Sequence, residues 1–507
     1  MAIDALRDGF VRMCFDPSLN VYEGKCRILL EGQVYSDGTT TCPIVLDQPM
    51  KITSTRQLAC QFGEGSVLAE SLKVAFGCCS NNAVEIWAIP REDADGAVKA
   101  VYTTTFTGNA TEDGRVDLYQ GDSRYNISVR ITAGMTPTQI AAAITAALNA
   151  LDGYPYLVTS ALGVMTQTAR NGGTVGNFLN PQFNWHGRND YFPTGVTFAT
   201  VQTTPGSVDP EPLDYISVLG ECCYCCVGML YGDNAWQDGM LAYLDDAWSC
   251  LKPQCFGHGY SYSAGSLGEI LSQFRDNSNV SFLAHCVTDP NFPWLKVAAY
   301  AAKSCCDAVD NPELSIQGAT NGVLSCLRFP ESCSQCFTFD EQEQLREAAF
   351  VVTVPVNGGQ GALTSPQISN DVTNNLYDEE GRDNATFRDV SAKRLASATA
   401  VSFAEKLQEF NGLGLYTKNT NIRPGVRGTN PRLMLGDLRA WAKDNVGILF
   451  SEFDDLDKDL TLLTDFQVAP KCQGVPGKLY VNMVYRPPVR IDRVVVNMQP
   501  KLLDNCN

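Results

Sequence analysis

The stretch GECCYCCVGML, residues 220–230, carries four cysteines around one tyrosine: Cys222, Cys223, Cys225 and Cys226. Thiols this close together could bind zinc or form a redox pair. On a strand, however, Cys222 and Cys226 would point to one face and Cys223 and Cys225 to the other, so the four could not converge on one metal ion. The run also resembles a parallel strand buried on both faces, where cysteine packs as a small hydrophobe. We therefore predict a buried strand here, with a metal or redox role as the alternative.

Two further groups contain residues that could bind metal. Cys333 and Cys336 form a CxxC pair, but a four-cysteine zinc site needs a second pair, and the sequence has none. A redox CxxC opens a helix after a strand, whereas this pair precedes its helix by several residues, which favours reduced thiols facing solvent. Cys250, Cys255 and His258 could form a mixed site, although His258 in the strand-like GHGY is better explained as a residue that packs or hydrogen-bonds.

The sequence lacks the usual catalytic patterns. GxSxG is absent, and none of the three histidines stands beside a nucleophile in a known motif: His186, His258 and His285. DDLDKDL, residues 454–460, begins like a calcium loop but has Leu460 and Phe466 where Gly and Glu are required. The turns that follow the apolar strands also lack the glycine-rich cradle of a nucleotide site. We expect no catalytic residue, no cofactor and no metal, and therefore a structural protein rather than an enzyme.

Composition limits the class of protein and its partners. A chain of 507 residues with 44% hydrophobic and 19% charged residues has the make-up of a folded protein of several domains. The formal net charge of −18 makes nucleic acid an unfavourable partner. No apolar run is long enough to span a membrane, and the first residues do not resemble a secretory signal, so we expect the chain to remain in a cytoplasm.

The expected secondary structure changes character along the chain. After a strand at 26–34, a helix at 65–77 and a strand at 83–89 that Pro90 ends, residues 97–207 read as short alternating strands with one helix, whose start carries the capping box Thr136–Gln139. From residue 222 strands and helices alternate, which indicates a largely parallel sheet. Two late helices, around 389–410 and 432–453, precede terminal strands. We predict an α/β and α+β multidomain fold, with a mixed sheet core covered by helices, a β-rich insertion and extended terminal arms.

The order of these segments resembles the tail sheath proteins of contractile bacteriophages. The segments that carry the resemblance begin with FGEGSVLAESLKVAFG, continue through the insertion and its Ala-rich helix, and include GHGYSYSAGSLGEIL, SNVSFLAHCV and FTFDEQEQLREAAFVVTV. The most specific short match is ARNGGTVGN, residues 169–177. The similarity is colinear over roughly residues 25–500, whereas the cysteine content departs from the family.

The resemblance implies a subunit that polymerises as stacked hexameric rings around a tail tube and contracts to drive the tube through the host envelope. The implied domains are an N-terminal arm (1–22), a first core part (23–96), an outward insertion (97–207), a second core part (208–380), a C-terminal domain facing the tube (381–488) and a C-terminal arm (489–507). The terminal segment would add a strand to a neighbouring subunit through Val489, Ile491, Val494, Val495, Val496 and Met498.

The implied partners are other copies of the chain, the tail tube protein, and the baseplate and tail terminator proteins, without nucleic acid or membrane insertion. The implied location is the virion tail, after assembly in the bacterial cytoplasm. A sheath from a headless, bacteriocin-type particle would have the same sequence features. An α/β enzyme or a redox or metal protein that uses the cysteines is the alternative from another class.

Overall fold

The computed structural model forms two compact units, residues 1–408 and 409–507, which are described separately. The described residues are 26–36, 44–79, 84–184, 192–220, 222, 224–232, 234–247, 257–327, 337–356, 365–377, 381–383, 387–410, 412–416, 421–451, 453, 455–464 and 479–483. None of the helices within these ranges is long and apolar enough to cross a membrane.

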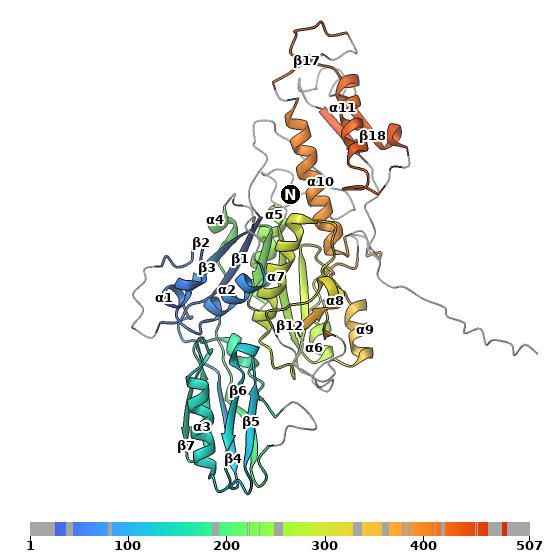
Figure 1. The fold of residues 1–507 in the computed structure, drawn as a ribbon. Coiled ribbons are helices and arrows are strands. Elements are labelled where there is room, and N and C mark those ends of the chain that lie inside the picture. Colours follow the sequence, from blue (N-terminus) through green and yellow to red (C-terminus); the bar gives the residue numbers. More distant parts are fainter. Residues whose placement is uncertain are drawn as a thin grey trace, which may run out of the picture. The chain divides into compact units, whose positions relative to one another are not determined.

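The core of the first unit is a six-stranded sheet with the order β13-β12-β11-β1-β3-β2. Its strands β1, β2, β3 and β12 are labelled in Figure 1. Five neighbouring strands run parallel: β1 (Cys26–Gln33), β3 (Val84–Arg91), β11 (Cys226–Met229), β12 (His258–Gly265) and β13 (Val280–Cys286). The edge strand β2 (Met50–Ile52) is antiparallel to β3. The central strands are largely buried, as expected for a parallel sheet covered on both faces, and they carry buried polar residues such as Glu31 and Gln33 of β1 among the apolar ones.

Helices cover both faces of this sheet. Gly228 faces Val297 and Ala301 of α7 (Pro293–Asp310), whereas the side chain of Met229, the next residue on β11, lies against Gly259 beside Leu244 of α5 (Asn234–Ala247). Since successive strand residues point to opposite faces, α7 and α5 cover opposite sides of the sheet. Helix α2 (Val67–Cys78) packs beside α7, after the short elements η1 (Thr55–Gln57) and α1 (Leu58–Phe62). Helices α4 (Tyr215–Leu219) and α6 (Leu267–Leu271) complete this part.

Residues 98–207, called the insertion below, form two sheets of their own between β3 and α4. One has the order β10-β4-β8-β7 and the other β6-β5-β9, and all their pairings are antiparallel. Helix α3 (Pro137–Asn149) packs on both, and its start has the predicted capping box of Thr136 and Gln139. The strands are β4 (Val101–Thr107), β5 (Gly114–Tyr119), β6 (Ile127–Ile131), β7 (Tyr156–Ala161), β8 (Val164–Ala169), β9 (Gln182–Phe183) and β10 (Thr197–Thr204), with η2 (Ser123–Tyr125) and η3 (Thr174–Phe178) between them.

The rest of the first unit follows the sheet. It comprises α8 (Gly318–Asn321), α9 (Phe339–Glu347), the antiparallel pair β14 (Thr353–Pro355) and β15 (Pro366–Ile368), and α10 (Val390–Gln408). Leu283 of β13 forms a parallel bridge with Val351, so this later segment extends the sheet beyond β13. A disulfide joins Cys78 at the end of α2 to Cys326, 248 residues later in the sequence.

The second unit is smaller. Asn430 caps α11 (Pro431–Asp444), whose apolar face packs on β18 (Leu460–Thr464), and β18 pairs antiparallel with β19 (Leu479–Met483). Arg439 of α11 forms an ion pair with Asp457 of α12 (Leu456–Asp459) at 2.7 Å. A short parallel pair joins β16 (Gly414–Leu415) and β17 (Gly428–Thr429).

The predicted α/β and α+β class is confirmed, with a mixed sheet covered by helices and a β-rich insertion. Pro90 does not end β3, because it lies inside the strand opposite Gly32. Its missing N–H is tolerated there because the pairing of β2 with β3 covers only Ile86 to Ala88. The second late helix was predicted too long: α11 ends at Asp444, and Gly447 turns the chain with a φ of +85°. The predicted terminal arms lie outside the described residues.

The predicted strand in GECCYCCVGML is correct only in its second half. Strand β11 begins at Cys226, and Cys222 is exposed ahead of it. The backbone N–H of Cys222 donates to the carbonyl of Leu219, so the chain is still turning out of α4 at that point. The predicted alternation of cysteines between two strand faces is therefore wrong for Cys222.

Candidate functional site: a joint between the core and the insertion

The two ends of the insertion meet at one backbone bridge. Val98 N–H donates to the carbonyl of Ser207 at 2.9 Å, and Ser207 N–H donates back to Val98 at 3.2 Å. Arg91, the last residue of β3, lies just before this bridge. Its guanidinium pairs with the Glu31 carboxylate on β1 at 2.6 Å and donates to the carbonyl of Glu211 in the returning chain at 2.5 Å. One buried cation thus holds together a core strand and the segment that comes back from the insertion.

Asn171, directly after β8, connects the insertion to the core through its side-chain amide. Its Oδ1 accepts the backbone N–H of Val67 at the start of α2 at 3.1 Å. Its Nδ2 donates to the carbonyl of Val34 at 2.8 Å and to Asp93 at 3.0 Å, and Asp93 also accepts the N–H of Gly172 at 2.8 Å. Because both ends of this nearly buried amide have partners, its orientation is fixed.

A close backbone contact lies between the turn after β5 and the start of α7. Gly121 donates its N–H to Pro290 at 2.5 Å and accepts the N–H of Phe292, the N-cap of α7, at 3.2 Å. Gly121 has a φ of +70°, and a Cβ at this position would lie 2.2 Å from the Phe292 ring. Only glycine satisfies both the left-handed backbone and this approach.

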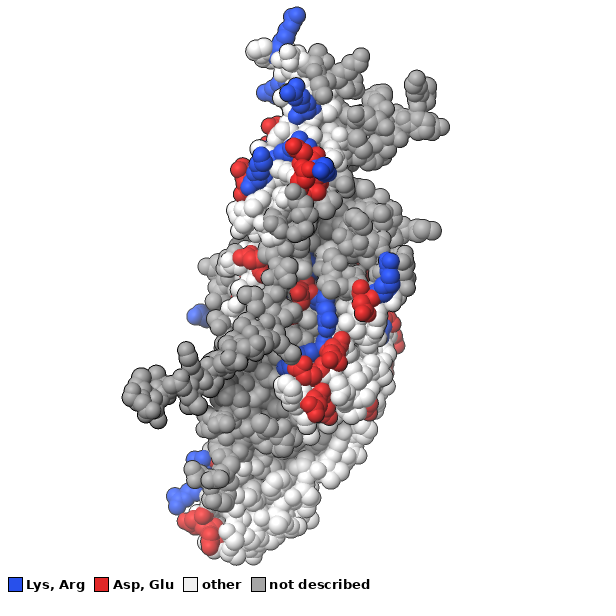
Figure 2. Space-filling view, turned by 90° about the vertical axis from the view of Figure 1, so that its right-hand side faces the viewer, with Lys and Arg blue, Asp and Glu red and all other residues white. Residues whose placement is uncertain are grey.

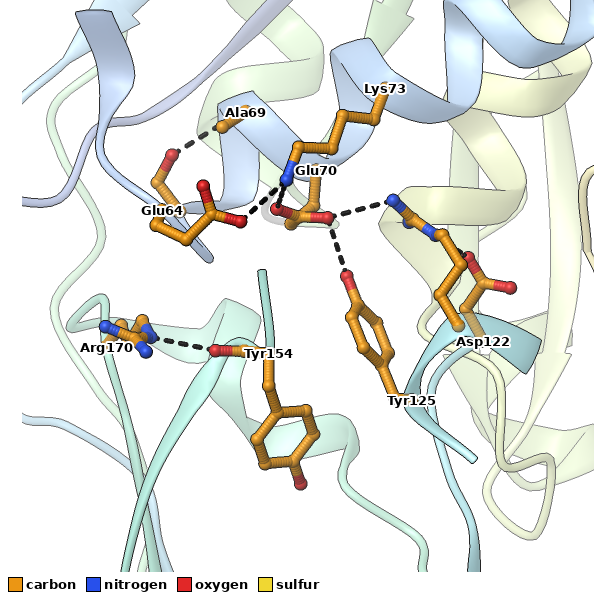
Figure 3. Close-up of polar contacts among 10 residues, drawn as sticks. Glu64, Ala69, Glu70, Lys73, Asp122, Tyr125, Tyr154 and Arg170 are labelled. Atoms are coloured by element: carbon orange, nitrogen blue, oxygen red, sulfur yellow. Dashed lines mark hydrogen bonds and ion pairs between the residues drawn. The ribbon is translucent and has the colours of Figure 1, made fainter. Parts of the chain in front are cut away.

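Glu70 of α2 is the centre of a buried charged group at the same joint (Figure 3). Its Oε2 accepts the Tyr125 hydroxyl at 2.8 Å and pairs with Arg124 at 2.9 Å, both from η2 of the insertion. Its Oε1 pairs with Lys73 on the next turn of α2 at 2.7 Å. Asp122 holds the other side of Arg124 at 2.5 Å.

The environment of Glu70 acts on its charge in two directions. Burial raises the pKa of the Glu70 carboxyl above its usual value, and the positive charges of Lys73 and Arg124 oppose this rise. The pKa of the Tyr125 hydroxyl is raised well above its usual value, chiefly by burial and then by the Glu70 charge, so Tyr125 acts as a hydrogen-bond donor. Each of these groups is thus used to bind the insertion to α2.

The geometry of this joint suits mechanical fixation better than chemistry. Side chains such as Glu70 and Tyr125 hydrogen-bond to one another across the boundary between core and insertion (Figure 3), and the Asn171 amide accepts a backbone N–H across it. Within the described part of the chain, no group of three or more His, Cys, Asp or Glu residues is arranged to hold a metal ion. Figure 2 shows acidic and basic side chains lying beside one another on one face of the molecule, where much of the described surface carries neither charge.

The histidines that the structure describes are structural. His258 lies buried on β12 with Nε2 2.9 Å from the Ser281 hydroxyl, which confirms that it hydrogen-bonds within a strand. Burial and the nearby Lys393 hold the pKa of His258 well below its usual value. Burial, together with Lys296, also lowers the pKa of His285 on β13, to about 3.

The other candidate residues lie outside the described residues. These are His186, Cys250, Cys255, Cys333 and Cys336 among the possible ligands, and the strand-exchange residues Val489, Ile491, Val494, Val495, Val496 and Met498. In DDLDKDL, Asp455 caps α12 and pairs with Lys458 at 2.8 Å, in agreement with an acidic helix end rather than a calcium loop.

The residues of the joint were not predicted as a site, although the sequence marked where they lie. Asn171 and Gly172 belong to ARNGGTVGN, the most specific short match to the sheath family, and Glu70 belongs to FGEGSVLAES. The residues of the joint therefore lie in motifs already noted in the sequence, but these motifs are far apart along the chain. Their convergence on one boundary, through partners such as Arg124 that are 54 residues from Glu70, is visible only in the fold.

Known proteins provide the remaining comparison. No family model matches the sequence. The Mu-like prophage FluMu tail sheath protein of Haemophilus influenzae is 24% identical over 397 residues, which make up 78% of each chain. This chain is related to a phage tail sheath protein. The resemblance predicted from the motifs is confirmed by this relative, and the sheath relationship extends over most of both proteins.

Solved sheath proteins are also among the similar structures. The sheath tail protein of Desulfitobacterium hafniense has a TM-score of 0.45 at 11% identity, over 90% of this chain and 93% of that protein. The sheath tail protein Lin1278 of Listeria innocua has a TM-score of 0.44 at 12% identity, over 92% of each chain. A chain of the anti-feeding prophage baseplate has a TM-score of 0.37 at 9% identity, over 59% of this chain and 76% of that one.

Proposed function

We propose that this chain is the structural subunit of a contractile tail sheath. It polymerises as stacked hexameric rings around a tail tube and contracts to drive the tube through the host cell envelope, so that the genome can be ejected. The observation that carries this proposal is the 24% identity to a prophage tail sheath protein over 78% of both chains. The function is mechanical, and the subunit needs no catalytic residue or cofactor.

The joint described above supports this proposal physically. A sheath subunit transmits force between neighbours, so its domains must move as rigid bodies while the connections between subunits bend. Buried charges and amides with fixed orientation, such as Glu70 and Asn171, resist rotation of the insertion against the core. In this proposal the connections between subunits are the arms, residues 1–22 and 489–507.

The proposed partners follow from the same role. The subunit binds other copies of itself by strand exchange through residues 489–498, the tail tube protein inside the sheath, and the baseplate and tail terminator proteins at its two ends. Its proposed location is the virion tail, after assembly in the bacterial cytoplasm, with no binding of nucleic acid and no insertion into a membrane. Main-chain hydrogen bonds supply the affinity in strand exchange, and the apolar Val and Ile side chains supply its register.

Electron microscopy of the purified full chain tests the assembly. Long hollow tubes with regular striations at high protein concentration are the expected result, because the proposed head-to-tail contacts generate an open polymer. Small closed oligomers at every concentration would contradict the sheath role and favour the alternative of an α/β enzyme or redox protein.

Truncation tests the proposed arm separately. A chain lacking residues 489–507 should remain folded, with the thermal unfolding profile of the parent, but should form no tubes. The matched control lacks only residues 499–507, keeps the predicted strand, and should assemble. Normal tubes from the longer truncation would show that residues 489–498 do not join subunits.

A further inference from the structure

Four cysteines from three separate elements meet at the amino end of the parallel sheet. Cys26 is the first residue of β1, Cys225 and Cys226 lie at the start of β11, and Cys305 lies on α7, which packs against both strands. Cys26 and Cys225 are half-buried, whereas Cys226 and Cys305 are buried. The sequence placed two of these thiols in one motif but gave no indication that Cys26 and Cys305 join them.

Strand register explains why Cys26 and Cys225 are neighbours. β1 and β11 are parallel with Ile28 opposite Cys226, so the chain just ahead of β11 lies beside the start of β1. Cys225 lies in a bend ahead of the strand, so its side chain need not follow the alternation of the sheet faces. Its thiol hydrogen-bonds to that of Cys26, and this contact is the geometric basis for a bond between the two residues.

Contacts between the thiols give the two cysteines different reactivity. Hydrogen bonds from the thiols of Cys225 and Cys305 stabilise the Cys26 thiolate, and they lower the pKa of Cys26 despite its burial. The same contact and burial raise the pKa of Cys225 well above its usual value, so Cys225 keeps its proton. A thiolate is the nucleophile in disulfide exchange, and a neighbouring thiol can resolve the resulting mixed disulfide.

We propose that Cys26 and Cys225 form a redox-active pair that closes to a disulfide when the protein meets an oxidising disulfide such as oxidised glutathione. Cys305 also contacts Cys26, but it is buried and stays reduced as a hydrogen-bond donor. The four thiols are not arranged as a zinc site, because the described residues contain no group of three or more His, Cys, Asp or Glu side chains that could hold a metal ion. The proposal stands on this geometry and does not depend on the sheath function.

The chemistry balances in two exchange steps. The Cys26 thiolate attacks one sulfur of oxidised glutathione, breaks its S–S bond and releases one glutathione thiolate. The Cys225 thiol then loses its proton, attacks the Cys26 sulfur of the mixed disulfide and releases the second glutathione. Two electrons pass from the cysteine pair to oxidised glutathione. The proton lost by Cys225, and the proton that Cys26 gave to solvent when it formed its thiolate, end on the two released glutathione molecules. The product is a bond between the amino ends of β1 and β11.

Peptide mapping of the full chain tests this assignment. The protein is incubated with oxidised glutathione, quenched in acid, and its remaining thiols are alkylated under denaturing conditions before chymotryptic digestion. Cleavage after Tyr224 separates Cys222 and Cys223 from Cys225 and Cys226, so the linked residues can be told apart. The expected product is a peptide containing Cys26 linked to one beginning at Cys225, with fragmentation placing the bond on Cys225.

Two serine variants make the result specific. In Cys225→Ser the resolving thiol is gone, so Cys26 should accumulate as the mixed disulfide with glutathione, at least tenfold above the parent. Cys222→Ser changes an exposed cysteine outside the cluster and should leave the Cys26–Cys225 bond unchanged. A bond from Cys26 to Cys305, or a Cys26 that stays fully alkylatable while Cys222 is oxidised, would overturn the proposal.

Discussion

The Tyr125 hydroxyl donates a hydrogen bond of 2.8 Å to Glu70, and these two residues belong to the insertion and to core helix α2. The same carboxylate oxygen pairs with Arg124, so one buried side chain binds two consecutive residues of the insertion (Figure 3). This makes Glu70 the residue through which the attachment of the insertion can be tested most directly.

Replacing Glu70 with alanine should destabilise the protein by about 3 kcal/mol, because it leaves the Tyr125 hydroxyl without its acceptor and Lys73 without its buried partner, and removes one of the two buried carboxylates that pair with Arg124. The free energy of unfolding from denaturant titration measures this effect. The matched control is Glu64→Ala, which removes only a partly exposed pair with Lys73 and should cost less than about 1 kcal/mol. Equal losses in the two variants would show that Glu70 has no special role in the joint.

The contact between Gly121 and Phe292 predicts a second difference. Gly121→Ala should destabilise the protein by about 2–4 kcal/mol, because the new methyl group must displace the Phe292 ring in addition to adopting a positive φ. Gly134→Ala is the control, since Gly134 has a φ of +89° and open space around it, and should cost only about 1 kcal/mol. Calorimetric unfolding of both variants measures the loss of stability in each. A loss for Gly121→Ala no larger than that for Gly134→Ala would rule out a tight contact between Gly121 and Phe292.

Glu31 predicts a pH dependence of stability. Burial raises the pKa of Glu31 to about 7, against the attraction of Arg91, whereas in the unfolded chain the carboxyl titrates near 4.5. A carboxyl whose pKa is higher in the folded state favours folding at low pH, and this contribution, about 3 kcal/mol at most, is lost as the pH rises from about 4.5 to 7.

The variant Glu31→Gln should remove this contribution. Relative to Glu31→Gln, the parent should therefore lose stability between pH 5 and pH 8, as measured by urea unfolding at each pH. The exposed Glu347→Gln serves as the control and should follow the parent. A parent and a Glu31→Gln variant with the same pH profile would contradict the assignment.

The disulfide between Cys78 and Cys326 predicts that the protein is more stable when oxidised. It closes a loop of 248 residues, and loops of this length are expected to contribute about 2–5 kcal/mol, mainly by restricting the unfolded chain. The double variant with both residues changed to serine should unfold at a lower temperature than the oxidised parent. A reducing agent should lower the unfolding temperature of the parent more than that of the double variant. An unchanged transition in the double variant would mean that this bond does not form in the protein.

Local signals predicted much of the fold. The capping box at Thr136–Gln139 lies at the predicted helix start, because a cap depends on residues three positions apart. The alternation of strands and helices from residue 222 onward likewise predicted the parallel sheet, because each strand and each helix has its own local pattern of residues. By contrast, the joint depends on partners such as Asn171 and Val67, which are 104 residues apart, and no pattern within one segment contains that pairing.

The thiol cluster illustrates the same limit in a single motif. The motif GECCYCCVGML suggests that its four cysteines interact with one another, whereas the structure places Cys225 and Cys226 with Cys26 and Cys305. Strand neighbours are determined by topology, and β1 pairs with β11 across an intervening stretch that contains the whole insertion.

The bridge between Val98 and Ser207 has a consequence for how such proteins can diverge. The chain leaves and re-enters the core at one backbone bridge, so the insertion connects its two core segments over a short distance, as a hairpin turn does. The order of the core strands does not depend on what lies beyond the bridge. We therefore expect that residues 98–207 could be exchanged as one unit in evolution, provided that the residues on the core side of the joint still match the contacts of the new insertion.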